Sequence, residues 1–204
     1  GVHPMARAVP RHYSSASEIP ADGFPVIIKP AVGCFGRGTL VAADWEEAQE
    51  GLNSQPGAWV MQEHIEDTHE FSTSMLVHNG AIFDAVTIEY VYDRGNYFWP
   101  RVVEMRHRTY WHAPADHLRQ LRPFLVGFGG VCNANYKIKD GKLRLFEFNP
   151  RVGGDLANDL PRERAAMLFS NLDLIERKAL EEMALESMPG RWVETGSFRM
   201  SGQF

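Results

Sequence analysis

The chain has 204 residues, of which 44% are hydrophobic and 23% are charged, enough apolar residues for one compact domain or two small ones. The formal net charge of −5, with scattered Lys and Arg residues, predicts neither a nucleic acid nor an anionic membrane surface as a partner. No apolar run approaches the roughly 20 residues of a membrane helix. Two cysteines are too few for a disulfide framework, so we expect a protein of the reducing cytoplasm.

The first part of the chain predicts a small α+β subdomain. Residues 1–23 are rich in Pro, Ser and Ala, which predicts an irregular lead-in, either a linker or the remnant of a preceding domain. The elements expected next are a strand at 24–30, a glycine-rich loop at 31–39, a strand at 39–43, a helix at 44–53 and a strand at 58–65. Asp44 and Glu47 have the spacing of a capping box at the helix start. The subdomain is therefore expected over residues 24–66.

The second part predicts a larger subdomain over residues 67–190, followed by a tail at 191–204. The expected elements are a hairpin at 70–90 around Asn79-Gly80, a loop at 91–114 with a strand at 101–108, a helix at 115–128 kinked or restarted at Pro123, a hairpin at 131–148 around Asp140-Gly141, and a helix at 161–188 capped by Asp159. Apolar residues at helical spacing predict the buried side of the last helix: Ala165, Leu168, Leu172, Ile175 and Ala179. Two hairpins, which form antiparallel strand pairs, together with a few helices predict the α+β class.

A glycine-rich loop follows the first strand, and Lys29 precedes it. Gly33, Gly36 and Gly38 would let backbone N–H groups approach a phosphate without obstruction by Cβ atoms. The loop is neither a P-loop, because Thr39 stands where the lysine would be, nor a dinucleotide fingerprint. Two interpretations stay open: a phosphate site with Lys29 as its cation, or an ordinary glycine turn beside a lysine that reaches solvent.

A second group of polar residues alternates along the strand that ends at Asn149. Glu147, Asn149 and Arg151 are two residues apart, so their side chains share one face of a strand. A carboxylate and an amide oxygen suit Mg²⁺, and a guanidinium suits a phosphoryl group in transfer. The alternative is a solvated polar face. Phe146 and Phe148 are expected on the opposite face.

The length of the Asp140-Gly141 loop decides which residues of the neighbouring strand join this group. A two-residue turn would place Ala134 opposite Glu147 and add no ligand. A three-residue loop, 139–141, would place Asn133 opposite Glu147 and Asn135 diagonal to it. We favour the three-residue loop because it completes the polar site.

Three segments together resemble the ATP-grasp superfamily, in particular carbamoyl-phosphate synthase large subunits and stand-alone carboxylate–amine ligases. They are FPVIIKPAVGCFGRGT, WVMQEHIEDTHEFS and NANYKIKDGKLRLFEFNPRVGG, which span about residues 24–154 in the family's order. The resemblance implies two α+β subdomains that clasp ATP between antiparallel sheets. It also implies ATP and Mg²⁺, or Mn²⁺ in its place, as cofactors.

The resemblance also implies a role for each candidate residue. Nucleotide binding would fall to Lys29 at the α and β phosphates, to Gly33, Gly36 and Gly38 in the flexible loop, to the hinge Glu63, His64 and Ile65 at the adenine, and to Glu70 at the ribose. The metal ligands would be Glu147, Asn149 and Asn135. Arg151 and Lys29 would be the catalytic residues. The family usually has a carboxylate at the position of Asn135, which leaves the affinity for magnesium in question.

The expected activity is that of an ATP- and Mg-dependent ligase, most simply one that forms a carbon–nitrogen bond. A small-molecule carboxylate would be activated as an acyl phosphate and captured by an amine or another nucleophile. Carboxylate recognition or a solvated loop are the two interpretations of segment 91–114, which contains Tyr92, Arg94, Arg101, Arg106 and Arg108. Most of the domain that precedes ATP-grasp folds is not recognisable, which points to a protein partner, a homodimer or a fragment.

Other classes explain the residues less well. The competing interpretation is a non-catalytic ATP-binding module, or a degenerate ATP-grasp subunit that acts with a partner. Eight histidines invite a zinc hydrolase, but HExxH is absent and His64 and His69 would lie on opposite faces of a strand. GxSxG is absent as well.

Overall fold

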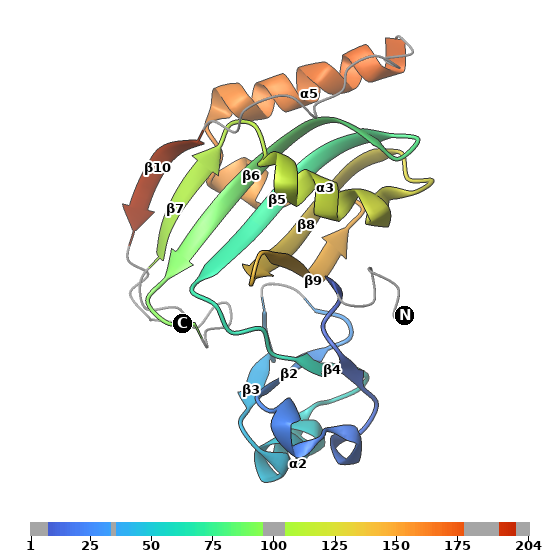
Figure 1. Cartoon of the computed structure of the whole chain (residues 1–204), viewed down its shortest axis with the longest axis vertical. Coiled ribbons are helices and arrows are strands. Elements are labelled where there is room, and N and C mark those ends of the chain that lie inside the picture. Colours follow the sequence, from blue (N-terminus) through green and yellow to red (C-terminus); the bar gives the residue numbers. More distant parts are fainter. Residues whose placement is uncertain (1–7, 34–35, 96–104, 178–191, 199–204) are drawn as a thin grey trace. The chain divides into compact units, whose positions relative to one another are not determined.

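The computed structural model describes residues 8–33, 36–95, 105–177 and 192–198. Within these residues the chain divides into two compact units, each built on its own sheet (Figure 1). Of the described residues, the smaller unit contains 9–33, 36–68 and 92–95, and the larger contains 8, 69–91, 105–177 and 192–198. Both sheets are antiparallel and carry a few helices, so the expected α+β class is confirmed. None of the helices in the described residues is long and apolar enough to cross a membrane.

The smaller unit is a four-stranded sheet with one helix. Its strands, in the spatial order β1-β4-β2-β3, are β1 (His12–Tyr13), β4 (Trp59–Glu63), β2 (Val26–Pro30) and β3 (Leu40–Ala42). Helix α2 (Trp45–Ser54) connects β3 to β4, and the short 3-10 turns η1 (Ala16–Glu18) and η2 (Ala21–Gly23) precede β2. The Cβ of a residue at position 51 would lie 2.9 Å from Leu40 Cδ1, so Gly51 lets α2 pack closely on the sheet.

The capping box of α2 is confirmed. The Asp44 carboxylate accepts from the Glu47 backbone N–H at 2.9 Å, and the Glu47 carboxylate accepts in return from the backbone N–H of Ala43 at 2.8 Å. The N–H group that donates to the Glu47 carboxylate thus belongs to Ala43, the residue before the N-cap Asp44. Both bonds satisfy N–H groups that the first turn of a helix leaves without an internal partner.

Segment 9–23 is not the irregular lead-in that its composition predicted. β1 pairs with β4, and Tyr13, Ala16 and Ile19 are buried in the core of the smaller unit. The other members of that core are Val26, Ile28, Ala42, Ala48 and Met61. The prediction failed because the partner of β1 lies about fifty residues away, and a two-residue strand leaves no periodic pattern in the sequence.

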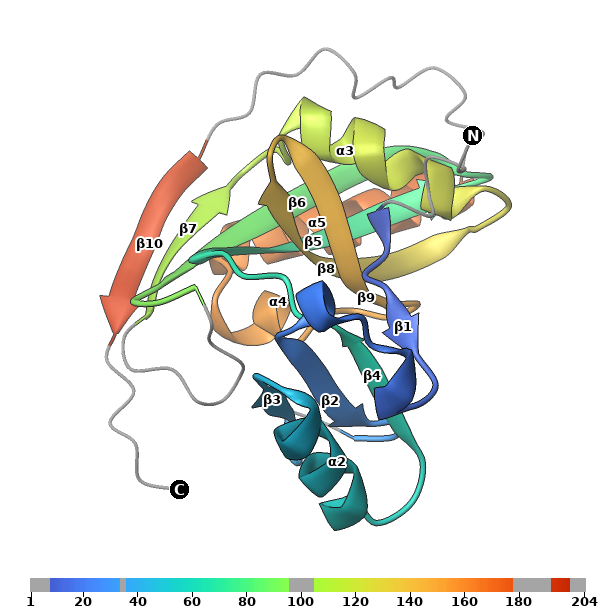
Figure 2. The ribbon, with the colours of Figure 1, turned by 60° about the horizontal axis from the view of Figure 1, so that its bottom comes forward.

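The larger unit is a six-stranded sheet in the order β10-β7-β6-β5-β8-β9. The strands are β5 (His69–His78), β6 (Ala81–Tyr92), β7 (Met105–Tyr110), β8 (Gly130–Lys139), β9 (Lys142–Asn149) and β10 (Trp192–Phe198). The helices are α3 (Ala115–Leu121), the 3-10 turn η3 (Arg122–Leu125), α4 (Asp155–Asn158) and α5 (Arg162–Arg177). Helices α3 and α5 lie on opposite sides of this sheet (Figure 2).

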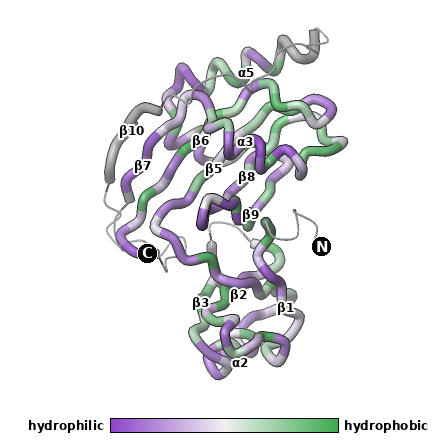
Figure 3. The backbone as a smooth tube through the Cα atoms, in the orientation of Figure 1, coloured by the Kyte–Doolittle hydropathy of each residue, from purple (hydrophilic) through white to green (hydrophobic). Residues whose placement is uncertain are grey.

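The α3 side of the larger sheet is its main apolar core. Phe71, Met75, Cys132, Ala134 and Tyr136 are buried there with Leu121 and Leu125 of the α3–η3 segment. A buried polar chain crosses this core: Thr73 Oγ1 lies 2.7 Å from Thr87 Oγ1 and 2.8 Å from the Tyr136 hydroxyl, which lies 2.9 Å from His117 Nδ1. Figure 3 shows the mixture of hydrophobic and hydrophilic residues along these strands.

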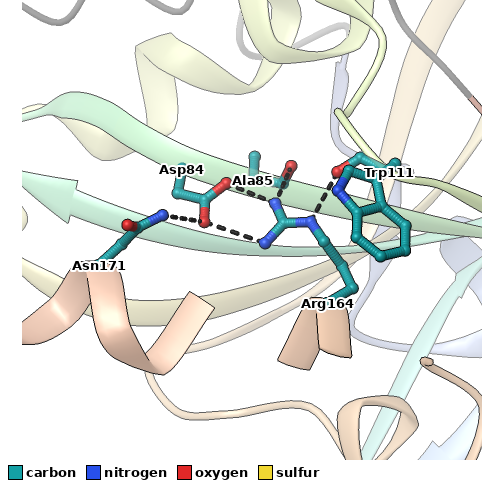
Figure 4. A network of polar contacts seen from close by, with 5 residues as sticks. All are labelled: Asp84, Ala85, Trp111, Arg164 and Asn171. Carbon is teal, nitrogen blue, oxygen red and sulfur yellow. Dashed lines mark hydrogen bonds and ion pairs between the residues drawn. The ribbon is translucent and has the colours of Figure 1, made fainter. Parts of the chain in front are cut away.

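The α5 side is held by a buried ion pair. Arg164 is 0% exposed, and its guanidinium makes two bonds to the Asp84 carboxylate, which is 5% exposed (Figure 4). It also donates to the carbonyl oxygens of Trp111 at 2.7 Å and Ala85 at 3.1 Å, while Asn171 Nδ2 donates to Asp84 at 2.8 Å. The network fixes α5 to β6, and each of the three guanidinium nitrogens has an acceptor, as a buried charge requires.

Several boundary predictions need adjustment. Asp159 does not cap α5: it ends α4, and its carboxylate accepts from the Tyr90 hydroxyl at 2.8 Å, while the first bond of α5 runs from Ala165 N to the Pro161 carbonyl. Of the strand expected at 101–108, residues 105–108 lie in β7, and residues 101–104 lie outside the described residues. Pro123 restarts the chain in the 3-10 turn η3, as expected. Leu168 is fully buried in α5, whereas residues 34–35, 96–104 (with Arg101) and 178–191 (with Ala179) lie outside the described residues.

Candidate functional site

A row of polar side chains crosses three neighbouring strands at the β9 end of the larger sheet. The registers pair Ser72 with Asn135, Ser74 with Asn133, Asn133 with Asn149, and Asn135 with Glu147. Because residues paired across antiparallel strands share a face, these six side chains form one continuous polar surface. Tyr136 and Ala134, which alternate with the two asparagines of β8, belong to the apolar core on the other face.

The route by which Asn135 meets Glu147 differs from the prediction. The loop has two residues, not three: Lys139 pairs with Lys142, and Asp140 and Gly141 both have positive φ, at 52° and 70°. A β-bulge then shifts the register, because Tyr136 pairs with Leu145 whereas Asn135 pairs with Glu147, which leaves Phe146 as the extra residue.

The bulge changes the outcome of both earlier alternatives. Neither Ala134 nor Asn133 lies opposite Glu147. Asn135 takes that position directly instead of diagonally. Phe148 packs against the apolar core, as expected of the opposite face. The three-residue loop was therefore wrong, although the polar residues that it was meant to gather do lie together.

Glu147 and its two amide neighbours have the character of a cation site. The exposed Glu147 carboxylate accepts from Asn149 Nδ2 at 3.0 Å and, at the limit of a hydrogen bond, from Asn135 Nδ2 at 3.4 Å. Asn135 Oδ1 is buried, and no group in the described residues donates to it. A buried acceptor without a donor is costly, and a cation beside the carboxylate would satisfy it. One carboxylate and two amide oxygens suit a hard divalent cation such as Mg²⁺.

A deeper layer of the same surface was missed by the sequence analysis. Asn133, 2% exposed, donates through Nδ2 to Ser72 Oγ at 2.9 Å and to Ser74 Oγ at 3.1 Å. The Ser72 hydroxyl in turn donates to the Asp155 carboxylate at 2.8 Å. Burial raises the pKa of Asp155, although the bond from Ser72 opposes this. Ser72 and Ser74 are two residues apart on an expected strand, which was a usable signal, whereas nothing near Asp155 indicated that it folds back onto β5.

Arg151 lies in the turn between β9 and α4. Its side chain is exposed, and Nη1 donates to the Val152 carbonyl oxygen at 2.9 Å. Glu70 lies on β5, paired with Tyr90, two residues before Ser72 and therefore on the same face as the polar row. The larger unit thus brings Glu70 and the three predicted metal ligands to one face of its sheet.

The smaller unit gathers the other predicted residues. Lys29 is half-buried in β2, paired with Val60, at the strand end from which the glycine loop leaves. Gly36 and Gly38 have φ of 63° and 78°, a conformation that favours glycine, and Gln55 Nε2 holds the Gly38 carbonyl oxygen at 2.7 Å. Gly33 is exposed.

The expected hinge begins at Glu63, the last residue of β4. The Glu63 backbone N–H donates to the Arg11 carbonyl oxygen at 2.8 Å, and that of His64 donates to the Pro25 carbonyl oxygen at 3.2 Å. Ile65 is 5% exposed. The segment is therefore anchored by its backbone to both neighbouring parts of the smaller unit.

A second polar cluster, on the α3 side of the larger sheet, was not anticipated. Glu89, 5% exposed, lies 2.6 Å from His69 Nδ1 and accepts from the Tyr110 hydroxyl at 3.1 Å. Burial, followed by the charge of Glu89, raises the pKa of Tyr110 to about 12. Within the described residues, no three His, Cys, Asp or Glu side chains are grouped so that they could hold a metal ion.

Similarity to known proteins agrees with this geometry. The family model of the ATP-grasp domain matches residues 4–155 of this chain. The chain belongs to the ATP-grasp family. It is also 25% identical over 151 residues to the carbamoyl phosphate synthase large chain of Mycobacterium sp. (strain JLS). That match covers 69% of this chain but only 13% of the relative, so the chain spans a small part of the longer protein.

Solved ATP-grasp structures share the fold. The D-alanine–D-alanine ligase of Bacillus anthracis aligns with a TM-score of 0.59 and 18% identity, over 87% of this chain and 64% of the ligase. Its complex with ATP aligns with a TM-score of 0.56. A biotin carboxylase from Campylobacter jejuni, also solved with a nucleotide, aligns with a TM-score of 0.52 and 17% identity, over 90% of this chain and 45% of the carboxylase.

Proposed function

We propose that this ATP-grasp chain binds Mg·ATP and transfers the γ-phosphate to a carboxylate, which an amine then captures. The observation that carries the proposal is the exposed Glu147 carboxylate set between two amides, one of which has a buried oxygen with no donor in the described residues. In a family defined by nucleotide binding, that donor set fits a magnesium ion held jointly by protein oxygens and phosphates.

The residues of the larger unit would act on the metal and the transferred group. Glu147, Asn149 and Asn135 would hold Mg²⁺, or Mn²⁺ in its place, after the two amides turn their NH2 groups away from the carboxylate and their oxygens toward the cation. The metal would neutralise phosphate charge during transfer. Arg151, two residues beyond Asn149, would donate to the phosphoryl oxygens as their charge develops. Glu70 would accept from the ribose hydroxyls.

The residues of the smaller unit would bind the rest of the nucleotide. Lys29 would contact the α and β phosphates, and Gly33, Gly36 and Gly38 would bring backbone N–H groups close to them. The Glu63–Ile65 segment, anchored through its backbone, would contact the adenine.

The chemistry divides into two balanced steps. A carboxylate oxygen attacks the γ-phosphorus and the bond to the β-phosphate oxygen breaks, which yields ADP and an acyl phosphate. An amine then attacks the acyl carbon, inorganic phosphate leaves and the amine loses one proton. The protein contributes mainly by positioning the reactants and stabilising charge.

The test is ADP release by the purified chain. With Mg·ATP and a panel of carboxylates and amines, the proposal expects ADP release that needs both co-substrates. The second candidate is a non-catalytic Mg·ATP-binding module, because the chain matches only 13% of the length of the longer relative. Such a module would bind ATP in calorimetry but release no ADP with any pair of co-substrates. The assay is repeated with candidate partner proteins that could supply the rest of the longer relative. No binding of Mg·ATP under any condition would overturn the proposal.

A further inference from the structure

The turn that carries Arg151 is tied to the sheet at both of its ends. It spans residues 150–154, between the last residue of β9 and the first residue of α4. At its start, Asn149 is paired with Asn133 in the sheet. At its end, Asp155 accepts from the Ser72 hydroxyl of β5 at 2.8 Å, a bond that joins residues 83 positions apart.

The hydrogen bonds at the second end have only one consistent direction. A carboxylate can only accept, so the Ser72 hydroxyl donates to Asp155 and its oxygen is left to accept from Asn133 Nδ2 at 2.9 Å. The second N–H of the same amide donates to Ser74 at 3.1 Å. Asp155, Ser72 and Asn133 therefore form a chain, named here the turn clamp, with each donor and acceptor assigned.

Gly153 fits into the clamp without room for a side chain. A Cβ at this position would lie 2.6 Å from Asn133 Nδ2 and closer still to an oxygen of Asp155. Its φ is not among the positive values of the described glycines, so the requirement for glycine here is space, not backbone conformation. Gly153, two residues after Arg151, therefore packs directly against the side chain of Asn133.

We propose that Asp155 is a positioning residue that fixes the 150–154 turn, and with it the Arg151 guanidinium, for the γ-phosphate. The inference rests on the proposed function, because it assigns Arg151 to the transferred phosphoryl group. Without the Asp155–Ser72 bond, the second end of the turn loses its tie to β5. Arg151 then samples more orientations and loses contact with the γ-phosphate, whereas the rest of the nucleotide site is unchanged.

The experiment measures the preference for Mg·ATP over Mg·ADP, since only ATP has the γ-phosphate. Calorimetry gives both Kd values for the full chain, Arg151→Ala, Asp155→Ala and the double variant. Each single variant should lower the ratio Kd(ADP)/Kd(ATP) about tenfold, the scale of one charge-assisted bond. The double variant should lower it no further, because both changes remove the same contact.

Ser72→Ala and Ser74→Ala form a matched pair of smaller changes, which also serve if Asp155→Ala does not fold. Ser72→Ala breaks the clamp and should lower the ratio, whereas Ser74→Ala leaves the Asp155–Ser72–Asn133 chain intact and should preserve it. If Arg151→Ala lowers the ratio but Ser72→Ala does not, or if the Asp155 and Arg151 effects add, the clamp is overturned and the proposed function stands. If the unaltered chain does not bind Mg·ATP, the proposed function itself fails.

Discussion

In the larger sheet, the β5–β6 and β8–β9 hairpins are built alike. Each has a two-residue turn in the left-handed conformation, Asn79-Gly80 or Asp140-Gly141. Each also carries one extra residue on its second strand. In β6 it is Phe83, because Leu76 pairs with Asp84 whereas Val77 pairs with Ile82. In β9 it is Phe146, and in both strands an acidic residue follows the bulge at once.

The two acidic residues have opposite environments. Asp84 is 5% exposed and its charge is matched by Arg164, with Asn171 as a further donor. Glu147 is exposed, and within the described residues its carboxylate accepts only from amide N–H groups. The same backbone irregularity thus yields one buried acid that is paired with Arg164 and one exposed acid that has no cationic partner among the described residues. That difference separates a structural residue from a candidate ligand-binding residue.

The largest expected effect comes from breaking the buried ion pair between Arg164 and Asp84. Arg164→Met leaves the Asp84 charge buried without its cation and should lower the free energy of unfolding by about 3–5 kcal/mol. Urea denaturation measures this. Glu147→Gln, the matched change at the exposed acid, should alter the free energy of unfolding by less than about 0.5 kcal/mol. Equal losses for the two variants would contradict the division into structural and binding acids.

A half-buried histidine on the α3 side, His117, extends the comparison to the dependence of stability on pH. Burial lowers the pKa of His117 from 6.5 to about 4, so between these values the unfolded chain binds a proton that the folded chain does not. Stability should therefore fall as the pH drops from 6.5 to 4, by about 2–3 kcal/mol. His117→Gln should flatten this part of the stability curve and His78→Gln, at an exposed position, should not. An unchanged slope in His117→Gln would show that other groups cause it.

Lys29 tests the proposed phosphate contact of the smaller unit. Lys29→Ala should weaken Mg·ATP binding by about 1–3 kcal/mol, the scale of a charge-assisted hydrogen bond. Calorimetry provides the measurement, and Lys139→Ala, an exposed lysine of β8, provides the control. ATP affinity that is the same in Lys29→Ala as in the unaltered chain would remove Lys29 from the site.

The smallest expected effect concerns the proposed metal ligand Asn135, which lies opposite the exposed Glu147. Asn135→Asp places a second carboxylate directly opposite Glu147 and should tighten Mg²⁺ in the presence of ATP by about 1 kcal/mol. Asn158→Asp adds the same charge at an exposed position of α4 and should leave the metal affinity unchanged. Magnesium titration of the ATP-bound variants separates the two, and identical curves would exclude Asn135 as a ligand.

Local patterns predicted local features, and long-range packing set the rest. The Asn79-Gly80 turn, the Asp44–Glu47 capping box and the restart at Pro123 each depend on a few neighbouring residues, so the sequence indicated them. The alternation of Glu147 and Asn149 likewise marked the polar face of β9 before any partner strand was known.

The missed features depend on contacts between distant segments. No glycine or proline marks the bulge at Phe146, so the sequence did not indicate it. The loop length was therefore inferred from the polar residues alone, and that length was wrong. The sequence analysis did not single out Arg164, because its partner Asp84 is 80 positions away, and Asp155 gave no sign of its bond to Ser72. In each case a polar residue is buried only because another element supplies its hydrogen bonds.

We propose above that Glu147 belongs to a magnesium site that forms with the nucleotide. The direct measurement is the thermal unfolding of the chain and of Glu147→Gln with ATP, with magnesium present or removed by EDTA. A ligand that binds only the folded state at 100 times its Kd adds about 2.7 kcal/mol of stability. The unaltered chain should gain more from Mg·ATP than from ATP alone, and Glu147→Gln should keep only the magnesium-independent part. An equal gain from magnesium in both proteins would contradict the claim.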